Sequence, residues 1–149
     1  MVNLFMNYFG QFDHAIDEEG KNKGIFLIYS HYPIFIGLIM VTVSMSFLVN
    51  SEAHHLFATG FFYTGIGLFQ AAILANGYFN KSHLKYDKLY YGLQAGMFLI
   101  GLVLSLLFSA NPTIVITIAT VMTLAMEVHF IHFYMTRTKK FSSPDWELY

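Results

Sequence analysis

The chain has 149 residues, of which 56% are hydrophobic and only 11% are charged, and its formal net charge is −1. Because soluble domains carry roughly 25% charged residues, a water-soluble fold of this length would need an unusually large buried core. The charge balance supplies no basic surface for neutralising phosphates, which excludes nucleic acid as a partner, and the absence of cysteine excludes disulfide frameworks and thiolate metal sites.

The first segment, residues 1–20, predicts a short amphipathic helix. Hydrophobic side chains recur at helical spacing from Phe5 to Ile16. The opposite face is acidic, from Asp13 to Glu19, whereas a helix that lies on a membrane surface usually shows lysine and arginine there. We therefore expect this helix to pack on a partner or to be the end of a preceding segment.

Four apolar stretches follow, each about long enough to cross the roughly 30 Å of a bilayer core as a helix. A helical reading is preferred because a spanning segment must satisfy its own backbone hydrogen bonds. The short connections predict antiparallel hairpins, so the expected fold is all-α, an integral membrane four-helix transmembrane bundle. The expected spans are about 25–49, 56–79, 89–109 and 113–136 within a domain of residues 21–140, and residues 141–149 form a flexible C-terminal tail.

All eight lysine and arginine residues fall on one side of this predicted topology. They precede the first span, separate the second from the third, or follow the fourth. The positive-inside rule then places both termini in the cytoplasm. The sequence thus predicts a multi-pass protein of the bacterial cytoplasmic (inner) membrane.

Small residues recur at four-residue spacing on two of the spans. Such spacing lets helix backbones approach closely inside a membrane. A path for a substrate along this small-residue face is the alternative interpretation. The residues assigned to helix packing are Gly67, Ala71 and Ala75 on the second span and Gly92 and Gly96 on the third.

The fourth span ends in "AMEVHFIHFYM", which carries a carboxylate and two imidazoles where a membrane segment should be apolar. Glu127 lies near the expected midplane, and His129 and His132 lie successively nearer the cytoplasm. Each such residue is costly in hydrocarbon, so we expect these side chains to face other protein groups. The other spans add His31, Gln70, Asn76 and Gln94, which gives every helix a polar group in the cytoplasmic half.

These seven polar residues allow three interpretations. They could bind or relay a proton, an ion or a small polar solute, with His31 and Glu127 as the titrating pair. They could instead form a neutral network that only fixes helix packing in a structural or assembly subunit. In a four-helix bundle, His31 opposite His129 or His132 could also ligate haem. A zinc site is weaker because Glu127, His129 and His132 do not all point the same way, and no enzyme motif or cofactor motif is present.

One stretch near the N-terminus resembles a known family. The segment "NYFGQFDHAIDEEGKNKGIFLIYSHYPIFIGLIMVTVS" is similar to the C-terminal half of the bacterial low-temperature-requirement A (LtrA) membrane proteins, with the best match over roughly residues 3 to 50. An aromatic "YF" helix end is followed by an acidic linker and then by "Y-x-H-x-P" entering a span. The positions that carry the resemblance are Tyr8, Phe9, Asp13, Asp17, Glu18, Tyr29, His31, Pro33 and Gly37.

The resemblance implies an integral membrane protein that is linked to growth at low temperature and is transport-like. LtrA proteins look more than twice as long as this chain, so the chain would correspond to a C-terminal half or to a short relative. The resemblance also supports His31 as a site residue, because His31 lies in the motif. Besides the lipid bilayer, the expected partners are further copies of the chain or a second membrane subunit.

Overall fold

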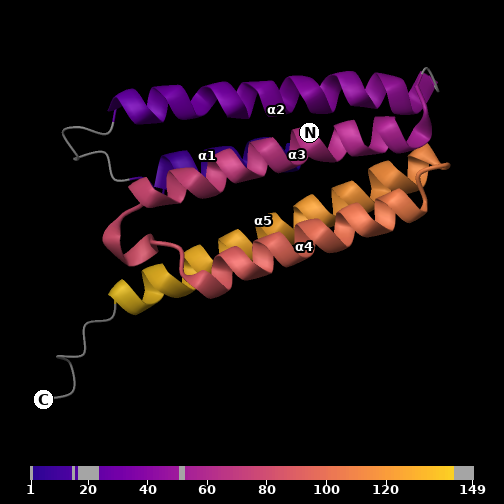
Figure 1. The fold of residues 1–149 in the computed structure, drawn as a ribbon. Coiled ribbons are helices and arrows are strands. Elements are labelled where there is room, and N and C mark those ends of the chain that lie inside the picture. The colour runs from indigo at the N-terminus through magenta and orange to yellow at the C-terminus, as the bar shows by residue number, and fades with distance from the viewer. Residues whose placement is uncertain (1, 15, 17–23, 51–52, 143–149) are drawn as a thin grey trace, which may run out of the picture.

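The computed structural model describes residues 2–14, 16, 24–50 and 53–142, and its elements over these ranges are helices. Four of them are long and apolar enough to cross a membrane, as the hydropathy pattern predicted. Figure 1 shows them as two helical hairpins whose long axes run side by side. The C-terminal tail predicted for residues 141–149 lies almost entirely outside the described residues.

The four long helices start and end close to the predicted bounds. The first span continues without a break through Pro33, although a proline inside a helix removes one backbone hydrogen bond. Pro112 begins the fourth span, where its missing N–H is not needed. The helices are α2 (Gly24–Asn50), α3 (His55–Asn76), α4 (Lys88–Leu107) and α5 (Pro112–Ser142), with short 3-10 helices η1 (Gly77–Phe79) and η2 (Ser82–Leu84) between α3 and α4.

The two ends of the bundle differ, and we name them by what they contain. The hairpin end holds the turns α2–α3 and α4–α5, on the right in Figure 1. The terminal end holds the start of α2, the η1–η2 connection and the end of α5. All described lysine and arginine side chains lie in the η1–η2 connection, at the start of α4 or in the last two turns of α5, which are all at the terminal end.

Side-chain contacts fix both helices of the second hairpin at the terminal end. Asp87 accepts a hydrogen bond from the backbone N–H of Tyr90 at 2.8 Å and so caps the first turn of α4. The other oxygen of Asp87 accepts from Arg137 at 2.9 Å. Arg137 also lies over the ring of Phe133, 5.2 Å from its centroid. The start of α4 and the end of α5 are therefore joined at this end.

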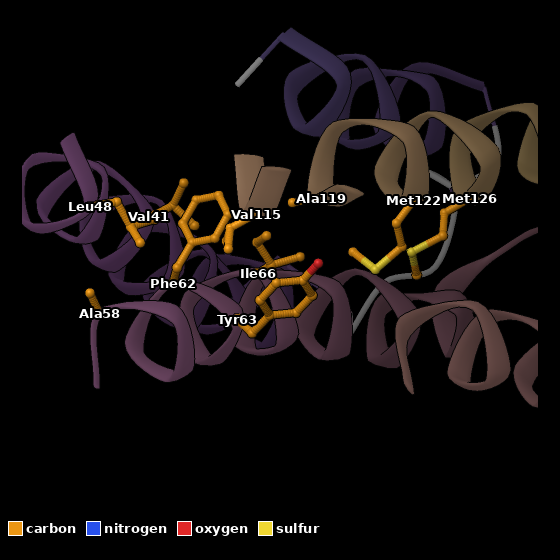
Figure 2. Close-up of a cluster of buried hydrophobic side chains, with 10 residues drawn as sticks. All are labelled: Val41, Leu48, Ala58, Phe62, Tyr63, Ile66, Val115, Ala119, Met122 and Met126. Carbon is orange, nitrogen blue, oxygen red and sulfur yellow. The ribbon is translucent and has the colours of Figure 1, made fainter. Parts of the chain in front are cut away.

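The hydrophobic core runs along the inside of the bundle. Its larger cluster joins α2, α3 and α5, and Figure 2 shows Phe62, Tyr63 and Ile66 of α3 reaching the side chains of α5. The two hairpin helices α2 and α3 come into backbone contact at Gly37 and Gly65, where a Cβ on either glycine would lie 2.8–2.9 Å from the carbonyl oxygen of the other. Only glycine permits this backbone contact.

The first helix, α1 (Val2–His14), packs lengthwise into the bundle. Asn3 donates to the Thr120 carbonyl and the Thr123 hydroxyl on α5, so this end of α1 is held by α5. A second, smaller core cluster joins its Leu4 to α2 and α3. Its inward side carries the buried Asn7 and Gln11, whereas Phe5 and Phe9 are exposed. The expectation that residues 1–20 pack on a partner or end a preceding segment stays a prediction, and Asp17, Glu18 and Glu19 lie outside the described residues.

Candidate functional site

A buried amide, Gln94, is the centre of the main polar cluster. Its side chain is fully buried between three helices. Its oxygen accepts from Gln70 Nε2 at 3.5 Å, and its nitrogen lies 3.1 Å from the Tyr90 hydroxyl and 3.4 Å from His129 Nδ1. We call Gln70, Tyr90, Gln94 and His129 the Gln94 cluster.

The hydrogen bonds of this cluster determine which way Gln94 and His129 point. Gln94 Nε2 also lies 3.2 Å from the backbone carbonyl of Met126, which can only accept, so the nitrogen of the amide must face α5. The same nitrogen has two hydrogens for three nearby acceptors, and its contact with His129 Nδ1 is the longest of the three, at 3.4 Å. The Tyr90 ring stacks on the imidazole with centroids 4.8 Å apart, which fixes its plane.

The cluster continues toward the terminal end as a chain of hydrogen bonds. The Tyr86 hydroxyl interacts with that of Tyr90 and with the Asn80 side chain. Asn80 in turn accepts from Gln11 Nε2 at 3.5 Å and donates to the Leu84 carbonyl at 3.2 Å. Burial raises the pKa of Tyr86 well above its ordinary value, so this phenol keeps its proton. The chain thus links α1, the η1–η2 connection, α4, α3 and α5.

Glu127 occupies a different face of α5 from His129. It is only 8% exposed and lies midway between the two ends of α5. A Cβ on Gly10 of α1 would lie 3.1 Å from the Phe130 ring, and Asn3 bonds Thr123, so α1 and α5 run parallel. The same register places the buried Asn7 level with Glu127.

His31 lies on the other side of α1. The Tyr8 hydroxyl and His31 Nε2 are 2.8 Å apart, and the Phe12 ring meets the imidazole edge-on with centroids 5.0 Å apart. Burial, and then the nearby charge of Asp13, raise the pKa of Tyr8. The described contacts of His31 are with Tyr8 and Phe12 of α1 and with Phe35 of α2, whereas Glu127 lies on α5.

Two further predicted site residues stand apart from the Gln94 cluster. His132 is exposed on α5. Asn76 is 1% exposed at the end of α3, and its amide nitrogen has no hydrogen-bond partner within the described ranges of the chain. The structure therefore joins Gln70, Gln94 and His129 directly, and it holds His31, Asn76, Glu127 and His132 at separate positions.

Several polar residues of the site were missed by the sequence interpretation. Asn7, Tyr8 and Gln11 lie on α1, which the sequence did not place inside the bundle. The sequence interpretation assigned no role to Tyr86 or Tyr90, although Tyr90 and Gln94 are four residues apart and so share a face of α4. That spacing was the sequence signal for this part of the site, whereas no sequence signal indicated the contribution of α1.

The small residues assigned to helix packing have different surroundings. A Cβ on Gly67 would lie 3.0 Å from the ring of Phe98 on α4, so this glycine lies at a helix contact. Ala71 and Ala75 are exposed. A Cβ on Gly92 or Gly96 would meet nothing within 4 Å, so these two glycines have no packing partner among the described residues.

Ligand groups for a metal ion are scattered over the part of the chain that the structure describes. No three His, Asp or Glu side chains come together there as a metal site would require. His31 and His129, proposed as alternative haem ligands, hydrogen-bond to Tyr8 and Gln94 through one ring nitrogen each. Ligation through those nitrogens would require both hydrogen bonds to break.

Comparison with known families decides the identity of this bundle. The family model described as bacterial low temperature requirement A protein (LtrA) matches residues 1–126. The chain belongs to the LtrA family. The match extends well beyond the stretch at residues 3 to 50 on which the resemblance was based, through α2, α3 and α4 and into α5. Searches of curated proteins and of solved structures gave no match.

The LtrA match covers most of the polar groups described above. His31, Gln70 and Gln94 lie inside it, together with Tyr8 on α1, while Glu127 follows its last residue. The fold and the family agree on a helical bundle of the membrane-protein type.

Proposed function

We propose that this LtrA-family chain is a transporter- or channel-like membrane module that binds and relays a proton through the polar groups of its terminal half. The observation that carries the proposal is the burial of Glu127, which is 8% exposed midway along an apolar helix. A carboxyl group at that depth costs about 2.5–3.5 kcal/mol on insertion scales, so a purely structural role would be served more cheaply by an apolar residue.

A proton suits the site better than an ion or a solute. The side chains around Glu127 and Gln94 include an imidazole, phenols and amides, which donate or accept hydrogen bonds. Charged groups in the region are few. Glu127 would bind the proton near the middle of the membrane, and His31 would exchange it nearer the terminal end. An amide does not readily pass protons on, so Gln94 acts by orienting His129.

The same proposal places the terminal end in the cytoplasm. The described lysine and arginine side chains gather there, which is the distribution that the positive-inside rule describes for cytoplasmic loops. The exposed side chains of the four long helices would contact lipid or a neighbouring subunit. We accordingly propose a multi-pass protein of the inner membrane.

A structural or assembly subunit is the second candidate, and one observation favours it. Gln94 links α3, α4 and α5 through hydrogen bonds that satisfy both ends of its amide. A network of this kind can serve to fix helix register and have no other role. This candidate predicts that substitutions in the Gln94 cluster lower stability or the binding of a partner and have no effect on proton flux.

Proton flux into liposomes tests the proposal. We expect Glu127→Gln to lower flux driven by a pH gradient at least tenfold, because an amide cannot bind and release the proton, and His31→Ala to lower it severalfold. Glu147→Gln, the same change at a position after the last apolar stretch, is the matched control and should retain wild-type flux. Wild-type rates in both site variants would remove the proposal.

A further inference from the structure

The first helix, α1, covers one face of α5. Asn3 donates a hydrogen bond to the Thr123 hydroxyl, one turn before Glu127. A Cβ on Gly10 would lie 3.1 Å from the Phe130 ring, about one turn after Glu127. Thr123, Glu127 and Phe130 are spaced by four and three residues, so they share one face of α5. Glu127 therefore lies between two places where α1 touches α5.

The facing side of α1 has the same spacing. Asn3, Asn7 and Gly10 are four and three residues apart, and the two helices run in the same direction. Asn7 therefore stands opposite Glu127, and the exposed fractions of the two side chains are 4% and 8%. On the opposite side of α1, Phe5 is 44% exposed. A single helix thus separates Glu127 from the surroundings of the bundle on this side.

The covered length of α5 reaches the terminal end. Figure 1 shows α1 extending from the middle of the bundle to that end. There, Gln11 Nε2 lies 3.5 Å from Asn80 Oδ1 in the η1–η2 connection. If α1 moved away from α5, the face of α5 from Glu127 to the terminal end would open.

Hydrogen bonds attach α1 more firmly to α2 than to α5. The two hydrogen bonds from Asn3 to α5 are 3.4 and 3.5 Å long, which exceeds the roughly 3 Å of a typical hydrogen bond. Packing at this place is also incomplete, because Leu4 and Thr123 are among the residues that line a cavity of about 80 Å³. On the α2 side, the Tyr8 hydroxyl and His31 Nε2 are only 2.8 Å apart. Among the described contacts of α1, those with α5 are therefore the easier to break.

We infer that α1 is a movable cover of Glu127, which parts from α5 and stays on α2 when this carboxyl group exchanges a proton with water at the terminal end. A carboxyl group enclosed between helices cannot exchange a proton with water, so a relay through Glu127 requires such an opening. The opening rests on the proposed function, whereas the shielding of Glu127 by α1 does not. In the closed arrangement, the Asn7 amide has both donors and an acceptor, so it suits the facing carboxyl group with and without its proton.

Cysteine labelling tests the shielding, because the natural chain contains no cysteine. Glu127→Cys in the full-length, reconstituted protein is reacted with a membrane-impermeant thiosulfonate added from the side of the terminal end. We expect labelling to become at least fivefold faster when Gly10→Leu is added, because the larger side chain forces α1 away from the Phe130 ring. Gly10→Ala is the smaller wedge if Gly10→Leu does not fold. Gly96→Leu, at a glycine whose Cβ would meet nothing within 4 Å, is the matched control and should leave the rate unchanged. Equal labelling rates with the wedge and with the control would overturn the cover.

Tying α1 to α5 tests the opening. Asn3→Cys and Thr123→Cys are combined, because their natural side chains lie 3.5 Å apart, and are bridged by a short bifunctional thiosulfonate. We expect the bridge to lower proton flux at least fivefold, because α1 can then no longer part from α5, and a reductant to restore the flux. The same treatment of either single variant is the control and should leave its flux as it was. Proton flux that is unchanged by the bridge would overturn the opening.

The two tests separate this inference from the proposed function. If proton flux depends on Glu127 but is unchanged by the bridge, the opening fails and the proposed function stands. If the wild type carries no proton flux, the proposed function and the opening fail together, while faster labelling of Glu127→Cys in the presence of Gly10→Leu still supports α1 as the cover of Glu127.

Discussion

Gln94 shows how one amide can determine the geometry of a buried site. Its nitrogen has three nearby acceptors, the Tyr90 hydroxyl, the Met126 carbonyl and His129 Nδ1, for two hydrogens. Since a carbonyl cannot donate, the Met126 contact removes the ambiguity that an amide side chain normally has. The side of the amide that faces His129 is therefore its nitrogen, 3.4 Å from Nδ1. In the proposed relay, Gln94 is therefore a positioning residue for the imidazole.

Alkaline pH gives a test of the buried phenol of Tyr86. Its pKa is raised by burial, so above about pH 10 the unfolded chain loses this proton while the folded chain keeps it. The folded state then binds more protons, and the free energy of unfolding, unaffected below that pH, falls as pH rises.

Thermal unfolding in detergent between about pH 8 and 11 measures this effect. We expect the loss of stability with rising pH to be shallower in Tyr86→Phe than in the wild type. Tyr29→Phe, at an exposed tyrosine, is the control and should follow the wild-type slope. Identical slopes for Tyr86→Phe and the wild type would show that the burial of Tyr86 does not govern the alkaline transition.

At the scale of the helix, the contact of α2 with α3 depends on two glycines. A Cβ on Gly65 would lie 2.9 Å from the Gly37 carbonyl oxygen and from Val41 N, which are backbone atoms that cannot yield cheaply. We expect Gly65→Ala to destabilise the chain by about 1–3 kcal/mol through overpacking. Gly96→Ala, where the added methyl meets nothing within 4 Å, should instead be neutral or stabilise by up to about 1 kcal/mol, since alanine favours a helix.

Chemical unfolding in detergent compares these two variants under the same conditions. A smaller loss of stability for Gly65→Ala than for Gly96→Ala would show that α2 and α3 do not meet as described.

The lengths of the helices could be predicted from the sequence, but their contacts could not. Apolar runs between polar turns indicated the starts of α2 to α5 to within one residue, whereas α5 continues six residues beyond the predicted end at 136, because hydrocarbon sets only a minimum of about 20 residues for a helix. Small-residue spacing indicated Gly92 and Gly96, yet the glycines whose added Cβ would meet the backbone of a neighbouring helix are Gly37 and Gly65. Spacing shows which residues share a face, but not which face meets a neighbouring helix.

For the molecule as a whole, the site depends on α1, and this dependence was not predictable from local pattern. Depth along each helix placed Gln70, Gln94 and His129 in the same half of the bundle, and in the structure hydrogen-bond distances link Gln94 to both of the others. The expected His31–Glu127 pairing required a direct contact, whereas α1 packs between the two, with Tyr8 bonded to His31 and Asn7 level with Glu127. Where a short helix docks is a long-range property of the fold.

Topology can be measured on the same cysteine-free chain. The proposed orientation predicts that Lys85→Cys, in the connection between α3 and α4, is labelled by an impermeant reagent only from the cytoplasmic side. Ala53→Cys, in the α2–α3 turn, should be labelled only from the opposite side. The reverse pattern would contradict the orientation, and labelling of both from one side would contradict the crossing of α3.

Infrared difference spectroscopy between acidic and alkaline pH measures proton uptake by Glu127 in the reconstituted protein. We expect a carboxyl stretching band from a buried, protonated group that appears in the wild type and in Glu147→Gln and is lost in Glu127→Gln. If the spectrum of Glu127→Gln keeps all the carboxyl bands of the wild type, the proposal is contradicted, because the buried carboxyl group then takes no part in proton exchange.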